Sequence, residues 1–314
     1  MTNIRTIAKK SGYSASTVSR FINQSGYVSD KASKEIKRII DEMDYVPNAI
    51  ARDLSKGQTF TIGVVVPHMR HPFFSELTHG IMDLAFAAEY NVLFLESQYD
   101  EKLEQKYLEK LHRKAFDALI FISRKLPLTE LIKYQKYGPV VCCENPQDNP
   151  IAAAYTLRES TYQQAFEWVK QGGYSKIAII LSRPYGNSAT SKIIFHSYKK
   201  VFGTFPDSNL VYTDCYNYND GYQSAHLIAR DTPDFIFGNS DDIIAGIYQY
   251  YLDNNLEVPA LMGQENQISG SLLKIPTIDH HLKMIGQAAC ELAITGAIKS
   301  VSIESEFYHQ IMSS

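Results

Sequence analysis

The sequence contains no long apolar run, and none approaches the roughly 18 residues of a membrane-spanning helix. Its first residues also lack the apolar segment of a secretory signal peptide. Cysteine is scarce, with four in 314 residues, and the spacing contains neither a CxxC pair nor a zinc-binding pattern. These absences argue against a membrane-spanning, secreted or disulfide-rich protein, and they favour the reducing cytoplasm.

Familiar catalytic motifs are absent as well. The sequence has no GxSxG elbow, GxxxxGK[ST] loop, GxGxxG fingerprint or HExxH pair. His280 and His281 are adjacent, so their side chains diverge and make a poor metal-binding pair. We therefore expect no cofactor, no metal and no catalytic residues. Pocket carboxylates leave no spacing pattern, so an enzyme of sugar metabolism stays an alternative.

Two short amphipathic helices are predicted at the N-terminus, over residues 3–10 and 15–23. Asn3 and Ser14 are suited to cap them, because short polar side chains accept hydrogen bonds from the first free N–H groups. Between the helices, Gly12 tolerates the positive φ of a tight turn. Two helices joined in this way predict a helix-turn-helix, whose second helix fits a DNA major groove.

The charge distribution favours DNA as the partner of this segment. A third helix is predicted from the cap Ser29, which would close a three-helix mini-core. Residues 1–38 carry eight Lys or Arg against two carboxylates, whereas the whole chain has a net charge of −3. A basic end on an acidic body is expected where only that end meets phosphate. A helical bundle without DNA-binding activity is the alternative on the helical pattern alone.

Two segments resemble one family of regulators. GYSASTVSRFIN, residues 12–23, closely resembles the recognition-helix signature of the lactose-repressor (LacI/GalR) family, and YVPNAIARDL, residues 45–54, is similar to its hinge segment. The resemblance continues through VVVPHMRHPFFSELTHGI, SDDIIAGIYQYYLDNNLEVP and IPTIDHHLKMIGQAACELA, so it spans nearly the entire chain. It implies a sequence-specific DNA-binding repressor of carbohydrate-utilisation genes, controlled by a small-molecule effector.

This resemblance, with the residue chemistry, assigns the candidate DNA contacts. Arg20 is the expected guanine contact, because a guanidinium binds guanine in a bidentate manner. Ala15 and Ser16 stand at the family's two specificity positions. Leu54 from two paired hinge helices would wedge into a minor-groove step. The full set of candidates is Ala15, Ser16, Thr17, Ser19, Arg20, Asn23, Asn48, Ala51, Arg52 and Leu54.

After Gly57 strands alternate with helices, which predicts parallel sheets with right-handed crossovers. TIGVVVP (61–67) is a continuous β-branched run, which predicts a strand buried on both faces of a sheet, and NVLFLES (91–97) and KIAIILS (176–182) are also predicted strands. Two series of such units suggest two α/β lobes, with ligand at the carboxyl ends of their strands. The resemblance implies the same core, like a periplasmic sugar-binding protein with three crossovers between lobes. The expected domains are a helix-turn-helix domain with its hinge helix (1–57, hinge about 47–55) and an effector-binding and dimerisation core (58–314), whose lobes are about 59–157 with 279–303 and about 158–278 with 304–314.

The effector is expected between the lobes. An aromatic ring such as Phe73 can pack on the C–H face of a sugar, and Glu265 matches a family position that accepts effector hydrogen bonds. Many relatives carry a pocket arginine where this chain has Ile194, and Lys192 is the nearest cation, so an anchor for a carboxylate or phosphate is not identified. The candidate effector contacts are Met69, His71, Phe73, Ser75, Lys192, Tyr216, Ser240 and Glu265.

The expected assembly is a cytoplasmic, nucleoid-associated homodimer that binds double-stranded DNA at a palindromic operator and binds a carbohydrate effector, without a membrane partner. No leucine-heptad extension follows the last strand-like segment, which favours a dimer over a tetramer. Lobe closure would change the separation of the marginal hinge helices, so effector and DNA affinities would be reciprocally coupled. The alternatives are control by a phosphorylated carrier protein and an extracytoplasmic solute-binding protein.

Overall fold

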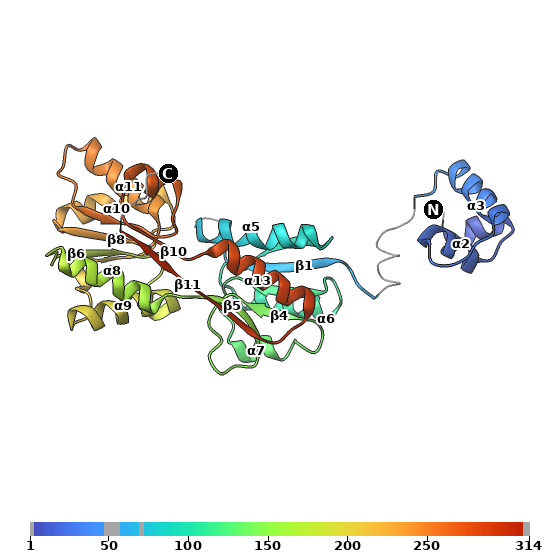
Figure 1. Ribbon diagram of the computed structural model, residues 1–314, viewed down its shortest axis with the longest axis horizontal. Coiled ribbons are helices and arrows are strands. Elements are labelled where there is room, and N and C mark those ends of the chain that lie inside the picture. Colours follow the sequence, from blue (N-terminus) through green and yellow to red (C-terminus); the bar gives the residue numbers. More distant parts are fainter. Residues whose placement is uncertain (1–2, 47–56, 69–71, 310–314) are drawn as a thin grey trace. The chain divides into compact units, whose positions relative to one another are not determined.

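The computed structural model describes residues 3–46, 57–68 and 72–309. They belong to two compact units, Met1–Phe60 and Thr61–Ser314 (Figure 1). No helix among the described residues has both the length and the apolar character needed to cross a bilayer. Six of the predicted contacts lie outside the described residues: Met69, His71, Asn48, Ala51, Arg52 and Leu54.

Residues 3–46 of the first unit form a three-helix head with caps at the predicted residues. Asn3, Ser14 and Ser29 each accept a hydrogen bond from the backbone N–H three residues later, at 3.0, 3.1 and 3.4 Å. Gly12 has the predicted positive φ of 73°. The small core of the head is made by the buried residues Ile7, Ala8, Val18, Ala32, Ile36 and Ile39. The helices are α1 (Ile4–Ser11), α2 (Ala15–Asn23) and α3 (Asp30–Glu42).

The second unit contains two parallel sheets, and the larger one has six strands in the order β11-β5-β4-β3-β1-β2. Central strand β1 is buried on both faces as predicted, because Val64 contributes to one hydrophobic core and Val65 to the other. The strands are β1 (Thr61–Val66), β2 (Asn91–Glu96), β3 (Ala118–Phe121), β4 (Val140–Cys142), β5 (Ala152–Leu157) and β11 (Ser300–Glu304).

Helices cover both faces of this sheet, and together they form what we call the N-lobe (Figure 1). Helices α5 (Pro72–Ala87) and α13 (Leu282–Thr295) pack side by side on one face. Helices α6 (Glu101–His112) and α7 (Leu128–Ile132) cover the other face.

The smaller sheet and its helices form what we call the C-lobe. Its strand order is β7-β6-β8-β9, and all neighbours are parallel. The strands are β6 (Ile177–Ile180), β7 (Val211–Tyr212), β8 (Phe235–Gly238) and β9 (Ala260–Met262). One face carries α8 (Glu159–Gln171) and α9 (Ala189–Phe202), and the other carries α10 (Tyr218–Arg230) and α11 (Asp241–Asp253). The remaining pieces are α12 (Ile268–Leu273) and the short 3-10 turns η1 (Tyr185–Asn187) and η2 (Ser208–Leu210).

The chain passes between the lobes three times. It passes first between β5 and α8, then between β10 (Thr277–Asp279) and α13, and last between β11 and β12 (Glu306–Tyr308). Strands β10 and β12 form an antiparallel pair, and their residues Ile278 and Phe307 pack in the C-lobe core. The three connections lie close together between the lobes (Figure 1).

Two elements of the N-lobe have no counterpart in the sequence prediction. Strand β5 has the sequence AAAYTL. Its small side chains do not form the β-branched run that predicts a buried strand, yet its first three residues are buried. Helix α7 spans only five residues, too few for a periodic pattern. Predicted strand β2 is present, but it lies at the sheet edge, where Leu93 and Phe94 stay 45% and 39% exposed.

The α5–α13 contact depends on two glycines. A Cβ at Gly80 would lie 2.0 Å from the carbonyl oxygen of Lys283, and one at Gly286 would lie 2.1 Å from that of Leu77. Both backbones are therefore in direct contact. We expect Gly80→Ala to lower the free energy of unfolding by roughly 1–3 kcal/mol, since the helices must separate.

Urea unfolding followed by circular dichroism measures this effect. Gly186→Ala is the matched control, because its Cβ would meet nothing within 4 Å and its φ is not positive. Equal unfolding midpoints for the Gly80 and Gly186 variants would contradict the packing argument.

Candidate functional sites

The first candidate site is the outer surface of α2 in the head. Ala15, Ser16 and Arg20 are exposed, whereas Val18 on the opposite side is fully buried. Small side chains at the start of a recognition helix permit close approach to base edges, and the exposed guanidinium supplies a bidentate donor. This surface has the chemistry of a major-groove reader.

The other α2 candidates are partly engaged within the helix. The hydroxyls of Thr17 and Ser14 lie 2.9 Å apart, and Asn23 Nδ2 donates to Ser19 Oγ at 3.2 Å. Thr17, Ser19 and Asn23 are half-buried. These fixed polar groups suit phosphate or neighbouring base contacts, which position a protein on the duplex without reading sequence.

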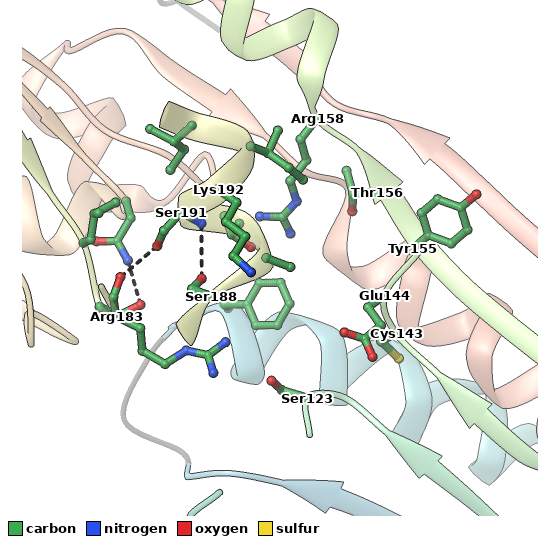
Figure 2. Close-up of a pocket in the computed structure, with 18 of the residues that line it drawn as sticks. Ser123, Cys143, Glu144, Tyr155, Thr156, Arg158, Arg183, Ser188, Ser191 and Lys192 are labelled. Atoms are coloured by element: carbon green, nitrogen blue, oxygen red, sulfur yellow. Dashed lines mark hydrogen bonds between the residues drawn. The ribbon is translucent and has the colours of Figure 1, made fainter. Parts of the chain in front are cut away.

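The second candidate site is a cavity of about 490 Å³ between the two lobes. Its walls come from the segments that follow β1, β2, β3 and β4 in the N-lobe and β6, β7, β8 and β9 in the C-lobe. Ligands of α/β proteins bind outside the carboxyl ends of parallel strands, and this volume is typical of a small-molecule pocket. Figure 2 shows polar and charged side chains from both lobes facing this space.

The cavity brings together four of the predicted effector contacts and leaves out two. Phe73, Lys192, Tyr216 and Glu265 line it. Ser75 does not line it, since it is exposed on α5.

Ser240 is the other predicted contact that lies outside the cavity lining. Its buried hydroxyl accepts a hydrogen bond from Asp242 N at 3.2 Å and donates to Gln267 Oε1 at 3.0 Å. Ser240 is therefore the N-cap of α11. The buried Asp241 carboxylate accepts from Gln267 N and from Thr277 Oγ1, at 2.7 and 2.8 Å.

Aromatic rings form one side of the cavity. The imidazole of His68 lies edge-on to Tyr216 and to Phe74, with ring centroids 5.0 and 5.3 Å apart. Tyr99 belongs to the same group, and its hydroxyl lies 3.1 Å from Ser123 Oγ. Such a wall offers apolar ring faces beside hydroxyl groups, which suits a polyhydroxylated ring.

Two arginines of the cavity were not predicted from the sequence, because the resemblance places a pocket arginine only at the position of Ile194. Arg158 lies at the first crossover, with its guanidinium 5.6 Å from the centre of the Phe73 ring. Arg183 follows β6, and its guanidinium lies 4.3 Å from the centre of the Tyr99 ring. The available signal was position, because Arg183 directly follows the predicted strand 176–182. The cavity thus contains arginines that could bind an anionic group of a ligand, and they come from the first crossover and the loop after β6 rather than from α9.

Two carboxyl groups of the cavity differ in their surroundings. Glu144 forms an ion pair with Arg124. Glu265 is half-buried, and burial raises its pKa well above the usual range, although nearby Arg158 acts in the opposite direction. Glu265 also accepts a hydrogen bond from Gln267 Nε2 at 3.3 Å.

A buried hydrogen-bonded group joins the cavity to the crossovers. Gln264 lines the cavity and is only 2% exposed. Its Nε2 donates to the carbonyl of Gly238 at 2.9 Å, and its Oε1 accepts from Tyr162 Oη at 2.9 Å. His280 Nε2 lies 3.0 Å from the same oxygen, and His280 Nδ1 lies 2.7 Å from Ser305 Oγ.

The protonation state of His280 follows from these partners. The bond to Gly238 orients the amide of Gln264, so the carboxamide oxygen faces the imidazole and can only accept. His280 Nε2 therefore carries the proton, and Nδ1 accepts from Ser305. Burial lowers the His280 pKa well below 6.5, and the charges of Arg158 and His281 lower it further.

The crossovers are also bonded to one another. Thr156 Oγ1 donates to the carbonyl of His280 at 3.1 Å, and Thr161 Oγ1 donates to the carbonyl of Ser305 at 2.9 Å. The first crossover is thereby fixed to the second and to the third.

A helix-turn-helix head together with a two-lobed core that encloses a polar cavity defines a class of protein: a regulator that combines DNA recognition with small-molecule binding. Comparisons agree. Residues 3–48 match the bacterial regulatory proteins of the lacI family, and residues 59–309 match the family of periplasmic binding proteins and the sugar-binding domain of the LacI family.

The chain is 34% identical to catabolite control protein B of Bacillus subtilis over 309 residues, covering 98% of this chain and 99% of that protein. The lac repressor dimer bound to operator and an anti-inducer is 17% identical with a TM-score of 0.79, covering 99% of both chains. A Lactobacillus casei LacI-family regulator with bound glucose is 20% identical with a TM-score of 0.69, covering 80% of this chain and 99% of that one. The chain belongs to the LacI family of transcriptional regulators.

The buried neutral His280 predicts a pH dependence of stability. The unfolded chain binds a proton at His280 near pH 6.5 while the folded chain does not, so stability is lost as the pH falls below about 6.5 toward the folded pKa. We expect His280→Gln to reduce the slope of unfolding free energy against pH by up to about 1.4 kcal/mol per pH unit in this window.

Urea unfolding between pH 6.5 and 5, followed by the fluorescence of the single Trp168 in the C-lobe, measures the slope. His226→Gln, which removes an exposed imidazole on α10, is the control and should leave the slope unchanged. Identical slopes for wild type and His280→Gln would contradict the assignment of a neutral His280.

Proposed function

We propose that this regulator is a homodimeric repressor of carbohydrate-utilisation genes, which binds a palindromic operator and is controlled by a carbohydrate effector in the interlobe cavity. The proposal rests on one observation: the same chain contains both the exposed α2 surface and a polar and aromatic cavity. The lac repressor dimer on its operator and the glucose-bound regulator support it by likeness of fold.

Each head is proposed to read one half of the operator. Arg20 is exposed on α2, and it takes part in no ion pair among the described residues. Its guanidinium is therefore available for a guanine. Ala15 and Ser16 would lie near the groove floor, where a methyl group and a hydroxyl discriminate neighbouring bases.

The hinge is the proposed switch. Leu54, with Asn48, Ala51 and Arg52 alongside, would enter the minor groove between two half-sites, and the cost of unstacking a base step would be offset by contacts to bent DNA. This assignment rests on the resemblance of residues 45–54 to the family hinge, because these side chains lie outside the described residues.

The dimer is proposed to form through exposed apolar side chains of the core. Met82 and Phe86 on α5 are 49% and 85% exposed, and Met284 on the adjacent helix α13 is 53% exposed. Large exposed apolar side chains on two adjacent helices are typical of protein–protein contacts. A second copy of the chain is the proposed partner, in the manner of the lac repressor dimer.

We further propose that the chain acts by binding alone, without catalysis, in the cytoplasm at the nucleoid. The family membership supports this, since the matched relatives are regulators. Turnover of any carbohydrate that binds the cavity would contradict it.

The specificity of α2 gives the first test. We expect Arg20→Ala to weaken binding to a selected operator by about 1–3 kcal/mol and to relax discrimination at one guanine position. Selection of operator fragments from a random pool, followed by gel shifts with single-base variants, measures both effects.

Lys34→Ala is the matched control, because Lys34 is an exposed cation on α3, away from the recognition helix. It should change affinity uniformly across sequences, as expected for a charge that meets only phosphate. If Arg20→Ala and Lys34→Ala give the same pattern across base variants, Arg20 reads no base.

The hinge gives the second test. We expect Leu54→Ala to weaken operator binding while leaving effector binding to the core intact, because a smaller side chain cannot hold a base step open. Gel shifts and calorimetric titration with an effector measure the two affinities. Unchanged operator affinity would exclude the wedge.

A further inference from the structure

Three basic side chains converge on the interlobe cavity from the C-lobe side. Arg158 comes from the first crossover, Arg183 from the loop after β6, and Lys192 from the start of α9. Figure 2 shows all three side chains directed toward the same space, with the Glu144 carboxylate across it. The cavity therefore presents a concentrated positive charge on one side.

The carboxylates of the cavity leave two of these three cations without an ion pair among the described residues. Among the described residues, neither Arg183 nor Lys192 forms an ion pair with a carboxylate. Glu144 pairs with Arg124, and Glu159 lies 4.0 Å from Lys200. Burial raises the pKa of Glu265, and the charge of nearby Arg158 lowers it.

Arg183 is held in a position to bind an anion. Its guanidinium carbon lies over the ring of Tyr99, 4.3 Å from the ring centre, a distance at which the cation is attracted to the ring. Among the described residues, no group accepts a hydrogen bond from this guanidinium, so its N–H donors are open to a ligand. The nearby α9 begins at the cavity with no acidic residue in its first turn, and the positive end of its dipole adds to the field there.

We propose that the effector carries a phosphate group, bound by Arg183, Lys192 and Arg158. This inference rests on the proposed function, because it names the chemical class of the ligand in the same cavity: a phosphorylated carbohydrate. A phosphate dianion presents several acceptor oxygens, which match two guanidinium forks and an ammonium. A single carboxylate would need only one of these groups.

The rest of the cavity suits the carbohydrate part of such a ligand. The rings of Phe73, Tyr99 and Tyr216 supply apolar surface, while Ser123 and Asn145 supply polar groups at the N-lobe side. The phosphate would lie toward the C-lobe, and the sugar ring would extend toward the strand ends of the N-lobe. The ligand would thus contact both lobes.

Calorimetric titration of the full-length protein tests the proposal. The probes are hexoses and pentoses, the monophosphate esters of the same sugars, the matching sugar acids, and inorganic phosphate. We expect at least one ester to bind about 10-fold or more tightly than its parent sugar and its sugar acid, with an affinity that falls as ionic strength rises.

Variants locate the phosphate. Arg183→Gln and Lys192→Gln should each weaken binding of the ester by about 10- to 100-fold, while affinity for the neutral parent stays within about 3-fold. Lys199→Gln is the matched control, because Lys199 lies on the same helix α9 but packs over Phe205, 4.5 Å from its ring centre. Since Lys192 is exposed, its replacement tests the proposal even if Arg183→Gln fails to fold.

The outcomes separate this inference from the proposed function. Neutral sugars that bind as tightly as their esters, without a response to either variant, would overturn the phosphate assignment and leave the carbohydrate cavity in place. A preference for sugar acids would also overturn it. Absence of binding by every probe, in a preparation that still binds operator DNA, would overturn the proposed carbohydrate effector itself.

Discussion

The buried carboxamide of Gln264 is the contact on which the geometry of the cavity depends. It joins the end of β8, through Gly238, to Tyr162 on α8 and to His280 at the second crossover. A buried polar group that loses one partner costs about 1–3 kcal/mol, and such bonds are stronger in a medium of low dielectric. The strand end, the helix and the crossover are therefore constrained to keep one relative arrangement around the cavity.

The chain presents its arginines in two different ways. Arg20 is exposed on α2, so its side chain can adapt to a base edge. The conformational entropy that the side chain loses when it is ordered is offset only by contacts with DNA. Arg183 is already oriented by Tyr99 within a partly enclosed cavity, where charge interactions are less screened than at the surface. The first arrangement favours discrimination among many sequences, and the second favours tight binding of one small ligand.

The sequence predicts local features of this protein well and non-local ones poorly. Asn3 and Ser14 cap their helices as predicted because a cap depends on residues three positions apart. Arg158 and Arg183 are 25 positions apart and meet only where two sheets and a crossover converge, so no local pattern identifies them. Ser240 illustrates the reverse case, since it matches a family contact in the local sequence but lies outside the cavity lining and caps α11. The assigned roles of the hinge side chains and of Met69 and His71 stay predictions.

The bonds among the crossovers bear on how a ligand could act at a distance. Thr156 and Thr161 fix the first crossover to the carbonyls of His280 and Ser305, so the three connections resist independent bending. A ligand changes the lobe angle only to the extent that it binds one angle better than another. A ligand that touches Phe73 in one lobe and the start of α9 in the other meets this condition, because its fit depends directly on the separation of the lobes. By linkage, whatever lobe angle the operator-bound head favours must then alter the affinity of the cavity by the same factor.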